Sequence, residues 1–287
     1  MGSDLFLHGN VDFAPLSKKN PRDRVRTTLP TALFLHHKLI IHILHVDNHG
    51  GAVAQTRISP PQEYKRLSIV HLSMQQITLS QVLPEVFRER TDLVSEVWRQ
   101  ELSLDRGKHY LIEASSGAGK SSFCSFVYGW RGDYSGRIAF DGQDIRALSA
   151  SAWGRIRRES LSFLFQDMRL FGELTAWDNV WIKNQLTGHK DRQTIEGYFE
   201  ALGIADKLKS PARLLSLGQQ QRLAAIRSLC QPFDFLLLDE PISHLDEANG
   251  RTLAGLITAE ATAQGASVIV TSVGKHLPLE YHHTYQL

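Results

Sequence analysis

The sequence predicts an α/β fold built on a mainly parallel β-sheet. Residues 235–238 and 266–271 form apolar runs with almost no polar interruption, which is typical of strands buried on both faces. Amphipathic helical patterns at 219–230 and 246–263 precede and separate these two runs. A further apolar run at 108–114 ends in a loop of glycine and serine residues. Strands that alternate with helices in this way favour parallel pairing.

Two other parts of the chain have different patterns. Residues 76–82 and 98–104 alternate apolar and polar side chains, and residues 136–142 look like a strand that enters an Asp-Gly turn. We expect these segments to form a small β-rich layer beside the core sheet. Residues 178–208 are mostly helical in pattern, with a short connection at Gly188.

Length and composition narrow the class of protein. With 287 residues and 42% hydrophobic content, the chain can bury one large core or two modest ones. Its formal net charge of +2 gives no indication of a nucleic-acid partner. Cys124 and Cys230 lie far apart and form no Cys-x-x-Cys pair, so we expect buried thiols in a reducing compartment.

No segment of the sequence has the length and apolar character of a membrane span. The best candidate, at 33–46, is shorter than the roughly 18–20 residues required, and it is interrupted by His36, His37, Lys38, His42 and His45. The N-terminus lacks the basic and then apolar pattern of a signal peptide. We therefore expect a soluble chain that needs another polypeptide for any role at a membrane.

Residues 1–67 differ from the remainder of the chain. Proline and basic residues punctuate them, and only 31–46 has a dense apolar pattern. The histidines of this region suggest either a metal site or an accidental cluster, and we favour the cluster because carboxylate and cysteine ligands are sparse nearby. We expect 1–67 to be a poorly structured or unassigned N-terminal extension, with a boundary near 65–70.

The loop Ala114-Ser-Ser-Gly-Ala-Gly-Lys-Ser121 follows a predicted strand and opens an apolar helical segment, as a phosphate-binding loop requires. Glycine lets backbone N–H groups turn inward around phosphates, lysine supplies a positive charge and the serine hydroxyl can ligate Mg²⁺. The fold is therefore expected to be that of a P-loop NTPase. The predicted nucleotide contacts are Ser115, Ser116, Gly117, Ala118, Gly119, Lys120, Ser121 and Ser122.

Two carboxylates stand where the buried strand at 235–238 meets the following loop. Asp239 is predicted to hold Mg²⁺ beside Ser121, because Mg²⁺ prefers oxygen ligands. Glu240 is one step further on and is predicted to polarise the attacking water as a general base. By itself this pair favours a solvated Asp-Glu turn after a core strand, and only the phosphate loop decides in favour of a catalytic role.

The segment Leu215-Ser-Leu-Gly-Gln219 precedes a helical pattern. It resembles the Leu-Ser-Gly-Gly-Gln signature of the nucleotide-binding subunit of ATP-binding cassette (ABC) transporters, and the resemblance covers roughly residues 74–287. The resemblance implies a cassette at 68–287, with an antiparallel β layer and a helical subdomain at about 168–230 that carries the signature. It also implies that Ser216, Gly218 and Gln219 bind the ATP held by a second cassette.

Further roles follow from the same resemblance. Gln166, in the segment 163–167, is similar to the glutamine that senses Mg²⁺ and the attacking water, and it joins Lys120 and Glu240 as a catalytic residue. Gln166 is also implied as a metal ligand with Ser121 and Asp239. The segment 168–180 would line the cleft where a permease helix docks, and 243–246 would cross the dimer interface. Phe87 would stack on adenine, with Trp98 as the alternative.

The chain departs from the family pattern at three positions. Ala114 replaces the first glycine of the phosphate loop, and Leu217 replaces the first glycine of the signature pair. Ser272 stands where the family usually has a switch histidine that touches the γ-phosphate. His276, four residues later, is a possible substitute or a surface histidine. Slow hydrolysis, or a partner cassette that supplies the competent site, follows as a hypothesis.

We expect an ATP-hydrolysing subunit, with ATP and Mg²⁺ bound, that drives a separate transmembrane permease through ATP-dependent dimerisation with a second cassette. The segment 166–180 is most similar to cassettes of the lipoprotein-release, macrolide-export and cell-division type. Such a subunit would be cytoplasmic and peripheral on the cytoplasmic face of the membrane. The alternatives are a non-transport ATPase that acts on nucleic acid or the ribosome, and a regulatory nucleotide-binding module with little turnover.

Overall fold

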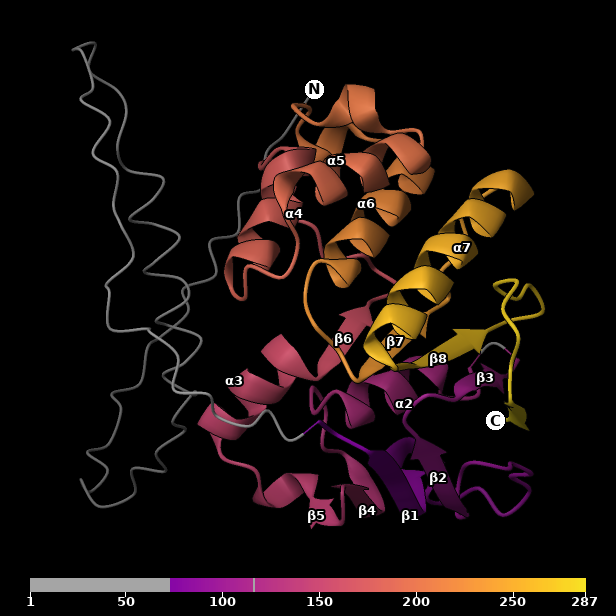
Figure 1. The fold of residues 1–287 in the computed structure, drawn as a ribbon. Coiled ribbons are helices and arrows are strands. Elements are labelled where there is room, and N and C mark those ends of the chain that lie inside the picture. The colour runs from indigo at the N-terminus through magenta and orange to yellow at the C-terminus, as the bar shows by residue number, and fades with distance from the viewer. Residues whose placement is uncertain (1–72, 116) are drawn as a thin grey trace, which may run out of the picture. The chain divides into compact units, whose positions relative to one another are not determined.

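The computed structural model describes residues 73–115 and 117–287. The predictions made for 1–67 and for Ser116 lie outside the described residues. Within the described part the chain forms two β-sheets and a set of helices, shown in Figure 1. The α/β fold predicted from the sequence is confirmed.

The larger sheet is parallel throughout. Its strand order is β6-β7-β8-β3-β9, with the bounds Leu161–Leu164, Phe235–Asp239, Ser267–Ser272, His109–Glu113 and His283–Gln286. All residues of β7 and β8 are buried. Alternate side chains of these strands enter two different hydrophobic clusters, since Leu236 and Leu238 join one cluster and Phe235 and Leu237 join the other. Burial on both faces explains why the apolar runs have no alternation.

The smaller sheet is antiparallel, as predicted, with the order β2-β1-β4-β5. The bounds are Glu101–Asp105, Gln76–Pro84, Tyr134–Phe140 and Gln143–Asp144. The register of β1 on β4 shifts between Ser80 and Leu83, and Gln81 there has φ of +52°. A Cβ on the opposing Gly136 would lie 2.2 Å from the Gln81 carbonyl oxygen, so this bulge needs glycine.

Two details of the smaller sheet test the sequence patterns. Asp141 and Gly142 have φ of +48° and +80°, which confirms the Asp-Gly turn after β4. The strand expected at 98–104 is shorter than predicted, because Arg99 has φ of +60° and strand pairing begins only at Glu101. The three residues before Glu101 form a turn that buries Trp98.

Six α-helices occur in the described residues: α2 (Lys120–Val127), α3 (Ala150–Glu159), α4 (Ala176–Gln185), α5 (Arg192–Ala201), α6 (Leu217–Leu229) and α7 (Glu247–Gln264). Short 3₁₀ turns stand at η2 (Glu85–Phe87), η3 (Ile145–Ala147), η4 (Ala205–Lys207) and η5 (Ala212–Leu214). Five of the α-helices begin where a side chain accepts a hydrogen bond from the first turn, at Ser149, Thr175, Asp191, Ser216 and Asp246. None of the helices described has the length and apolar character to cross a bilayer.

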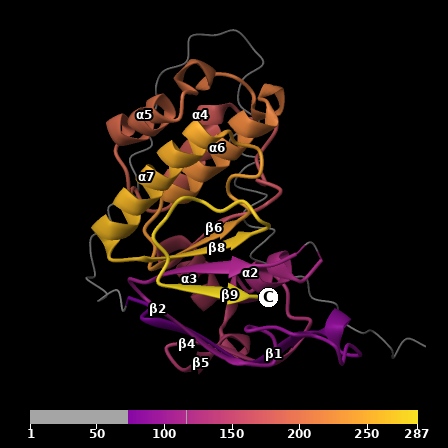
Figure 2. The same ribbon diagram turned by 90° about the vertical axis from the view of Figure 1, so that its right-hand side faces the viewer.

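Helix α2 lies between the two sheets, while α6 and α7 cover the other face of the parallel sheet (Figures 1 and 2). Cys124 of α2 and Cys230 after α6 are buried free thiols, as predicted. Burial raises the pKa of the Cys230 thiol to about 12, so this group stays protonated near neutral pH.

Asp234 links the residues just before β1 of the antiparallel sheet to the start of β7 of the parallel sheet. Its buried carboxylate accepts hydrogen bonds from the Ser73 hydroxyl (2.7 Å) and the Met74 backbone N–H (2.8 Å), just before β1. The Arg106 guanidinium after β2 lies 3.3 Å from the same carboxylate. Asp234 itself immediately precedes β7, so one side chain positions the antiparallel sheet against the parallel sheet.

We predict that Asp234→Ala lowers the free energy of unfolding by about 2–3 kcal/mol, because Arg106 loses its carboxylate and buried donors lose an acceptor. Urea denaturation followed by circular dichroism measures this change. Asp92→Ala is the matched control, since the Asp92–Arg90 ion pair is exposed and should contribute less than about 1 kcal/mol. Equal urea midpoints for the two variants would contradict the prediction.

Candidate nucleotide site

The phosphate loop connects β3 to α2. Gly117 and Gly119 have φ of +82° and +102°, a conformation that glycine adopts without strain. Gly119 is the N-cap residue of α2 and has no side chain that could cap the helix, so among the described residues the first N–H groups of α2 remain for an anion. Ala114 is absent from the described residues with positive φ, and its N–H donates to the Ser272 carbonyl at 3.1 Å. Alanine therefore fits the first position of the loop.

Two aromatic side chains support this loop from the core. A Cβ on Gly119 would lie 3.1 Å from Phe87 Cε2 and 3.2 Å from Trp98 Cζ2. The Trp98 indole N–H donates to the Ala118 carbonyl at 3.1 Å. Both rings are buried, and the Arg90 guanidinium lies 5.7 Å above the Phe87 ring. Here the two candidates for adenine stacking hold the loop in place, and the stacking role of Phe87 stays a prediction.

Lys120 is buried and bridges the loop and the acidic end of β7. Its ammonium group donates to the Ser115 carbonyl at 3.2 Å and lies 3.7 Å from Glu240 Oε1. The carbonyl and the carboxylate hold the buried Lys120 ammonium group near the position where the phosphates of a nucleotide would bind. The structure thus brings together two residues that are far apart in the sequence.

The first turn of α2 contacts the segment after β6. The Ser121 hydroxyl donates to the Gln166 amide oxygen at 3.1 Å, and both residues are exposed. Ser122 has another partner, because its hydroxyl accepts a hydrogen bond from the Arg131 guanidinium at 3.0 Å. Ser121 and Gln166 therefore lie together as the metal prediction requires, while Ser122 is tied to the far end of α2.

The end of β7 holds its two carboxylates in different ways. Asp239 is buried and accepts a hydrogen bond from the Thr271 hydroxyl at 2.5 Å, which fixes it against β8. Glu240 has φ of +49°, a left-handed conformation that costs about 1–2 kcal/mol for a residue with a Cβ. Its N–H donates to the Thr271 carbonyl (3.1 Å) and its carbonyl accepts from Gln221 (2.9 Å). These bonds hold the turn that directs Glu240 toward Lys120.

The donor set fits a magnesium ion. Ser121, Gln166 and Asp239 supply a hydroxyl, an amide oxygen and a carboxylate, which are the oxygen ligands that Mg²⁺ prefers. Among the described residues no group of three or more His, Cys, Asp and Glu side chains is arranged to hold a metal. Mg²⁺ usually binds through one or two carboxylates together with water and substrate phosphates. A magnesium site therefore does not require a group of three such side chains.

The signature segment begins α6. Ser216 caps the helix through a capping box, in which the Gln219 N–H donates to the Ser216 hydroxyl and the Gln219 side chain accepts from the Ser216 N–H. Leu217 is exposed. A Cβ on Gly218 would lie 2.8 Å from the His244 carbonyl oxygen, so the segment 243–246 packs directly on this glycine.

The signature does not reach the phosphate loop of its own chain. Among residues 73–115 and 117–287, no hydrogen bond or ion pair joins Ser216, Gly218 or Gln219 to residues of that loop. The helix start with its serine cap stays exposed at the surface.

Sequence reasoning missed Gln221. This residue of α6 is buried, and its amide group donates to the Glu240 carbonyl (2.9 Å) and the Ser243 hydroxyl (3.1 Å) and accepts from the His244 N–H (2.9 Å). It therefore links the signature helix to the end of β7. A polar residue on the apolar face of a helical pattern was the available signal.

Ser272 and His276 make contacts away from Lys120. The Ser272 side chain is buried and its hydroxyl donates to the Lys275 carbonyl. His276 Nε2 lies 2.6 Å from the Glu113 carboxylate, at the end of β3. A hydrogen bond from Gln286 and then one from His276 lower the pKa of Glu113. His276 thus has a local partner at the start of the phosphate loop.

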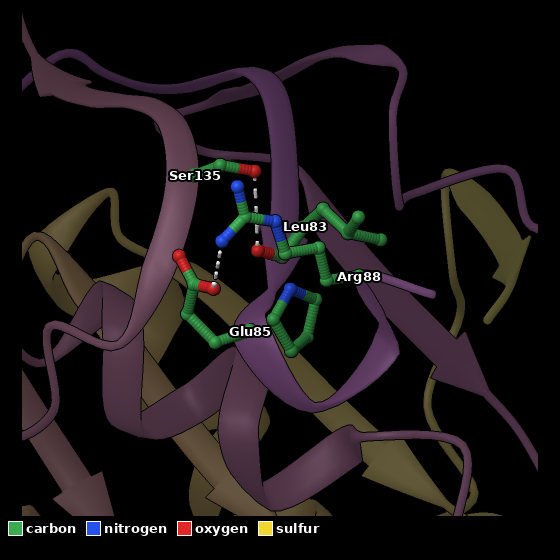
Figure 3. A pocket seen from close by; sticks show the side chains of 5 residues that line it. Leu83, Glu85, Arg88 and Ser135 are labelled. Atoms are coloured by element: carbon green, nitrogen blue, oxygen red, sulfur yellow. Dashed lines mark hydrogen bonds and ion pairs between the residues drawn. The ribbon is translucent and has the colours of Figure 1, made fainter. Parts of the chain in front are cut away.

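A cavity of about 120 Å³ lies apart from these residues, on the antiparallel sheet (Figure 3). It is lined by Leu83, Pro84, Glu85, Arg88 and Ser135. Glu85 and Arg88, which both line the cavity, form an exposed ion pair at 3.8 Å. None of the predicted nucleotide contacts lines this cavity, so the cavity is not part of the candidate nucleotide site.

The model of the ABC transporter family matches residues 98–243, which include the phosphate loop, the signature and both carboxylates. This chain belongs to the ABC transporter family. Its ATPase cassette fold follows from this membership and agrees with the two sheets and the helices described above.

Relatives of this cassette include transporter subunits. The lipoprotein-releasing system ATP-binding protein LolD of Shewanella denitrificans is 30% identical over 185 residues, which are 63% of this chain and 78% of LolD. The macrolide export ATP-binding/permease protein MacB of Shewanella sp. (strain ANA-3) is 32% identical over 180 residues. The match covers 61% of this chain but only 27% of MacB. This chain thus corresponds to about a quarter of that relative.

A solved structure of a bacterial ABC transporter cassette in dimeric form has the same fold. It superimposes with a TM-score of 0.56 at 25% sequence identity, and the match covers 68% of this chain and 87% of that cassette. A related structure, a post-hydrolysis state with ADP and Pi bound, gives a TM-score of 0.56 at 24% identity. The cassette fold predicted from the sequence is confirmed.

We predict that Gly218→Ala lowers the free energy of unfolding by about 1–3 kcal/mol, because its Cβ would meet the His244 carbonyl. Gly255→Ala in α7 is the matched control, since a Cβ there meets nothing within 4 Å, and alanine should stabilise that helix by about 0.5–1 kcal/mol. Urea denaturation of both variants measures the difference. Stabilisation of the same size in both would show that Gly218 has room for a side chain.

Proposed function

We propose that this cassette binds and hydrolyses ATP to drive a separate membrane permease. The observation that carries the proposal is the arrangement at the end of the parallel sheet. Lys120 lies 3.7 Å from Glu240, and Ser121 lies 3.1 Å from Gln166. The relatives named for lipoprotein release and macrolide export support a transporter rather than an ATPase that acts on nucleic acid or the ribosome.

We propose that the loop 115–122 binds the phosphates of ATP. The free N–H groups at the start of α2 and the Lys120 ammonium would face the β- and γ-phosphates. Ser121, Gln166 and Asp239 would hold Mg²⁺, which neutralises phosphate charge when bound. Phosphate oxygens would then replace Glu240 as the partner of Lys120. This exchange frees the Glu240 carboxylate for its role in hydrolysis.

Hydrolysis would use Glu240 as the general base. A carboxylate released from Lys120 can accept a hydrogen bond from a water molecule and orient it toward the γ-phosphate. Gln166 would help to position the same water, since its amide already lies against Ser121. The left-handed turn at Glu240, held by Thr271 and Gln221, limits the orientations of this carboxylate. Catalysis is thus mainly positioning and charge stabilisation.

We propose that two cassettes form the complete site. Ser216, Gly218 and Gln219 stand at an exposed helix start that has no contact with their own phosphate loop. Placed against the nucleotide of a second cassette, the Ser216 hydroxyl and the helix N–H groups would contact the γ-phosphate. The helical segment at about 168–230 would carry this signature. The second cassette would be a copy of this chain or a related chain.

The permease would contact the segment 168–180, which follows Gln166 and leads into α4. We propose that the cassette works as a cytoplasmic, peripheral subunit on the inner face of the membrane. A second candidate, a regulatory module with little turnover, is supported by one observation. The Ser272 hydroxyl is bonded to the Lys275 carbonyl and His276 is paired with Glu113, and among the described residues no hydrogen bond or ion pair joins either side chain to Lys120 or Glu240.

Lys120→Ala should weaken ATP binding at least about tenfold, because a charge-assisted phosphate contact contributes about 1.5–3 kcal/mol. Isothermal titration calorimetry with ATP and Mg²⁺ measures the dissociation constant. Lys108→Ala is the control, since this lysine is half exposed and pairs with Asp105 outside the site. If both variants bind ATP equally, the phosphate loop assignment is wrong.

Glu240→Gln should lower steady-state turnover by about 10²–10³-fold, because the base is lost, and should accumulate a dimer in millimolar ATP. Phosphate release and sedimentation velocity measure the two effects, and Glu280→Gln, an exposed residue, is the control. A monomeric Glu240→Gln variant in ATP would exclude the paired site. A parent chain that dimerises with ATP but releases no phosphate would favour the regulatory module.

A further inference from the structure

Gln166 is followed by a strained turn. Met168 and Arg169 have φ of +58° and +47°, a left-handed conformation that a Cβ disfavours. The Arg169 N–H donates to the Asp167 carbonyl at 2.6 Å and closes a three-residue turn around Met168. Such a turn with positive φ at its centre is rare and strained. The chain therefore needs further contacts that keep residues 167–169 in this conformation.

Arg227 of α6 supplies contacts of this kind. Its Nη1 donates to the Arg169 carbonyl at 2.7 Å, and its Nη2 donates to the Met168 carbonyl at 2.5 Å. A guanidinium presents its N–H groups in a rigid fork, so the two bonds fix two successive carbonyls together. Burial lowers the pKa of Arg227 to about 10, which leaves the group charged near neutral pH. One side chain thus holds both left-handed residues.

The residues on either side of Gln166 are anchored in different hydrophobic clusters. Phe165 packs on the cluster that includes the antiparallel sheet and α2, and its ring lies 4.0 Å from the Phe163 ring. Met168 is buried in the other cluster, which includes Leu223 of α6. Gln166 itself is exposed. Packing therefore does not hold its side chain, and the direction of this side chain depends on the backbone before and after it.

The contact between Gln166 and Ser121 depends on this backbone. The Gln166 amide oxygen accepts a hydrogen bond from the Ser121 hydroxyl at 3.1 Å. If the turn at 168–169 relaxed to a right-handed or extended conformation, its carbonyls would rotate and the backbone at Gln166 would move. Only Asp167 separates Gln166 from the left-handed residues, so little chain is left to absorb the change.

We propose that Arg227 is a positioning residue for Gln166: its guanidinium keeps the left-handed turn at 168–169 in place, and the turn directs the Gln166 amide to Ser121. This inference rests on the proposed function, in which Ser121, Gln166 and Asp239 hold Mg²⁺. Arg227 is not itself a metal ligand. Loss of a group that orients a ligand usually weakens metal binding about 10- to 100-fold.

Helix α6 then contacts the candidate site at two places. Gln221 donates to the Glu240 carbonyl at 2.9 Å, and Arg227 binds the turn after Gln166. Both side chains belong to the helix that Ser216 caps. The helix thus positions the proposed general base through one residue and the proposed metal ligand through another.

The first test uses the full chain with ¹⁵N-labelled glutamine, without nucleotide or metal. The Gln166 signals are assigned through Gln166→Ala, in which they vanish. We expect Arg227→Met to shift the backbone and side-chain amide signals of Gln166, because the turn loses both donors. Arg222→Met is the matched control, since Arg222 also donates to carbonyls from α6, but to those of Gly218 and Leu202. It should leave the Gln166 signals in place.

Arg227→Lys keeps the charge but lacks the fork, so it should shift the same signals. Circular dichroism confirms that each variant is folded. If Arg227→Met fails to fold, Arg227→Lys provides the answer by itself.

The second test follows ATP turnover as a function of free Mg²⁺. Gln166→Ala and Arg227→Met should each raise the Mg²⁺ concentration for half-maximal turnover about tenfold. The double variant should be no weaker than Gln166→Ala alone, because Arg227 acts through Gln166. A merely structural role would lower the folded fraction and leave this Mg²⁺ concentration unchanged.

Glycine at position 169 tests the strain directly. In the Arg227→Met background, Arg169→Gly should return the Gln166 signals and the Mg²⁺ response toward those of the parent, since glycine adopts the left-handed conformation without help. Arg169→Ala is the matched control. Both substitutions remove the guanidinium that lies above Trp130, but alanine keeps a Cβ and should not rescue.

Four results would overturn the proposal. Two are unchanged Gln166 signals in the folded Arg227 variants and equal rescue by glycine and alanine. The third is a normal Mg²⁺ response in Arg227→Met beside a weakened one in Gln166→Ala, which refutes this inference but not the proposed function. The fourth is a normal Mg²⁺ response in Gln166→Ala, which refutes the proposed metal ligand as well.

Discussion

Parallel pairing of β7, β8 and β3 places the carboxyl ends of these strands at one edge of the sheet, and the nucleotide site depends on that edge. β3 ends in the phosphate loop, β7 ends in Asp239 and Glu240, and the segment after β6 supplies Gln166. The hydrogen bond from Thr271 to Asp239 fixes the ends of β8 and β7 relative to each other. Ligands of open α/β sheets bind at this edge for the same geometric reason.

The edge is held in place by contacts from both layers. On the side of the antiparallel sheet, Trp98 and Phe87 pack under the phosphate loop. On the side of the helices, Gln221 binds the carbonyl of Glu240 and the backbone of His244. The strained turn at Glu240 persists because these surrounding bonds determine it. A movement of α6 would therefore change the position of the proposed general base.

Two routes thus lead away from the site toward the surface. One passes through Gln221 to the exposed signature at Ser216 and Gly218, which the proposed second cassette would use. The other passes through Gln166 and Phe165 to Trp130, which is 52% exposed. Both routes consist of packed or hydrogen-bonded side chains.

The sequence by itself determined the parts whose signals are local. The glycines and lysine of the phosphate loop, the carboxylates after an apolar run, the Asp-Gly turn at 141–142 and the serine cap of α6 can each be predicted from short patterns, because backbone conformation and strand burial restrict the residues at those positions. The tertiary structure alone decided which distant residues meet. Gln221 below Glu240, His276 on Glu113, Trp98 beneath Gly119 and the arginines around Trp130 all depend on contacts between separate elements. Such contacts arise from how the sheets and helices pack, and no spacing along the chain encodes them.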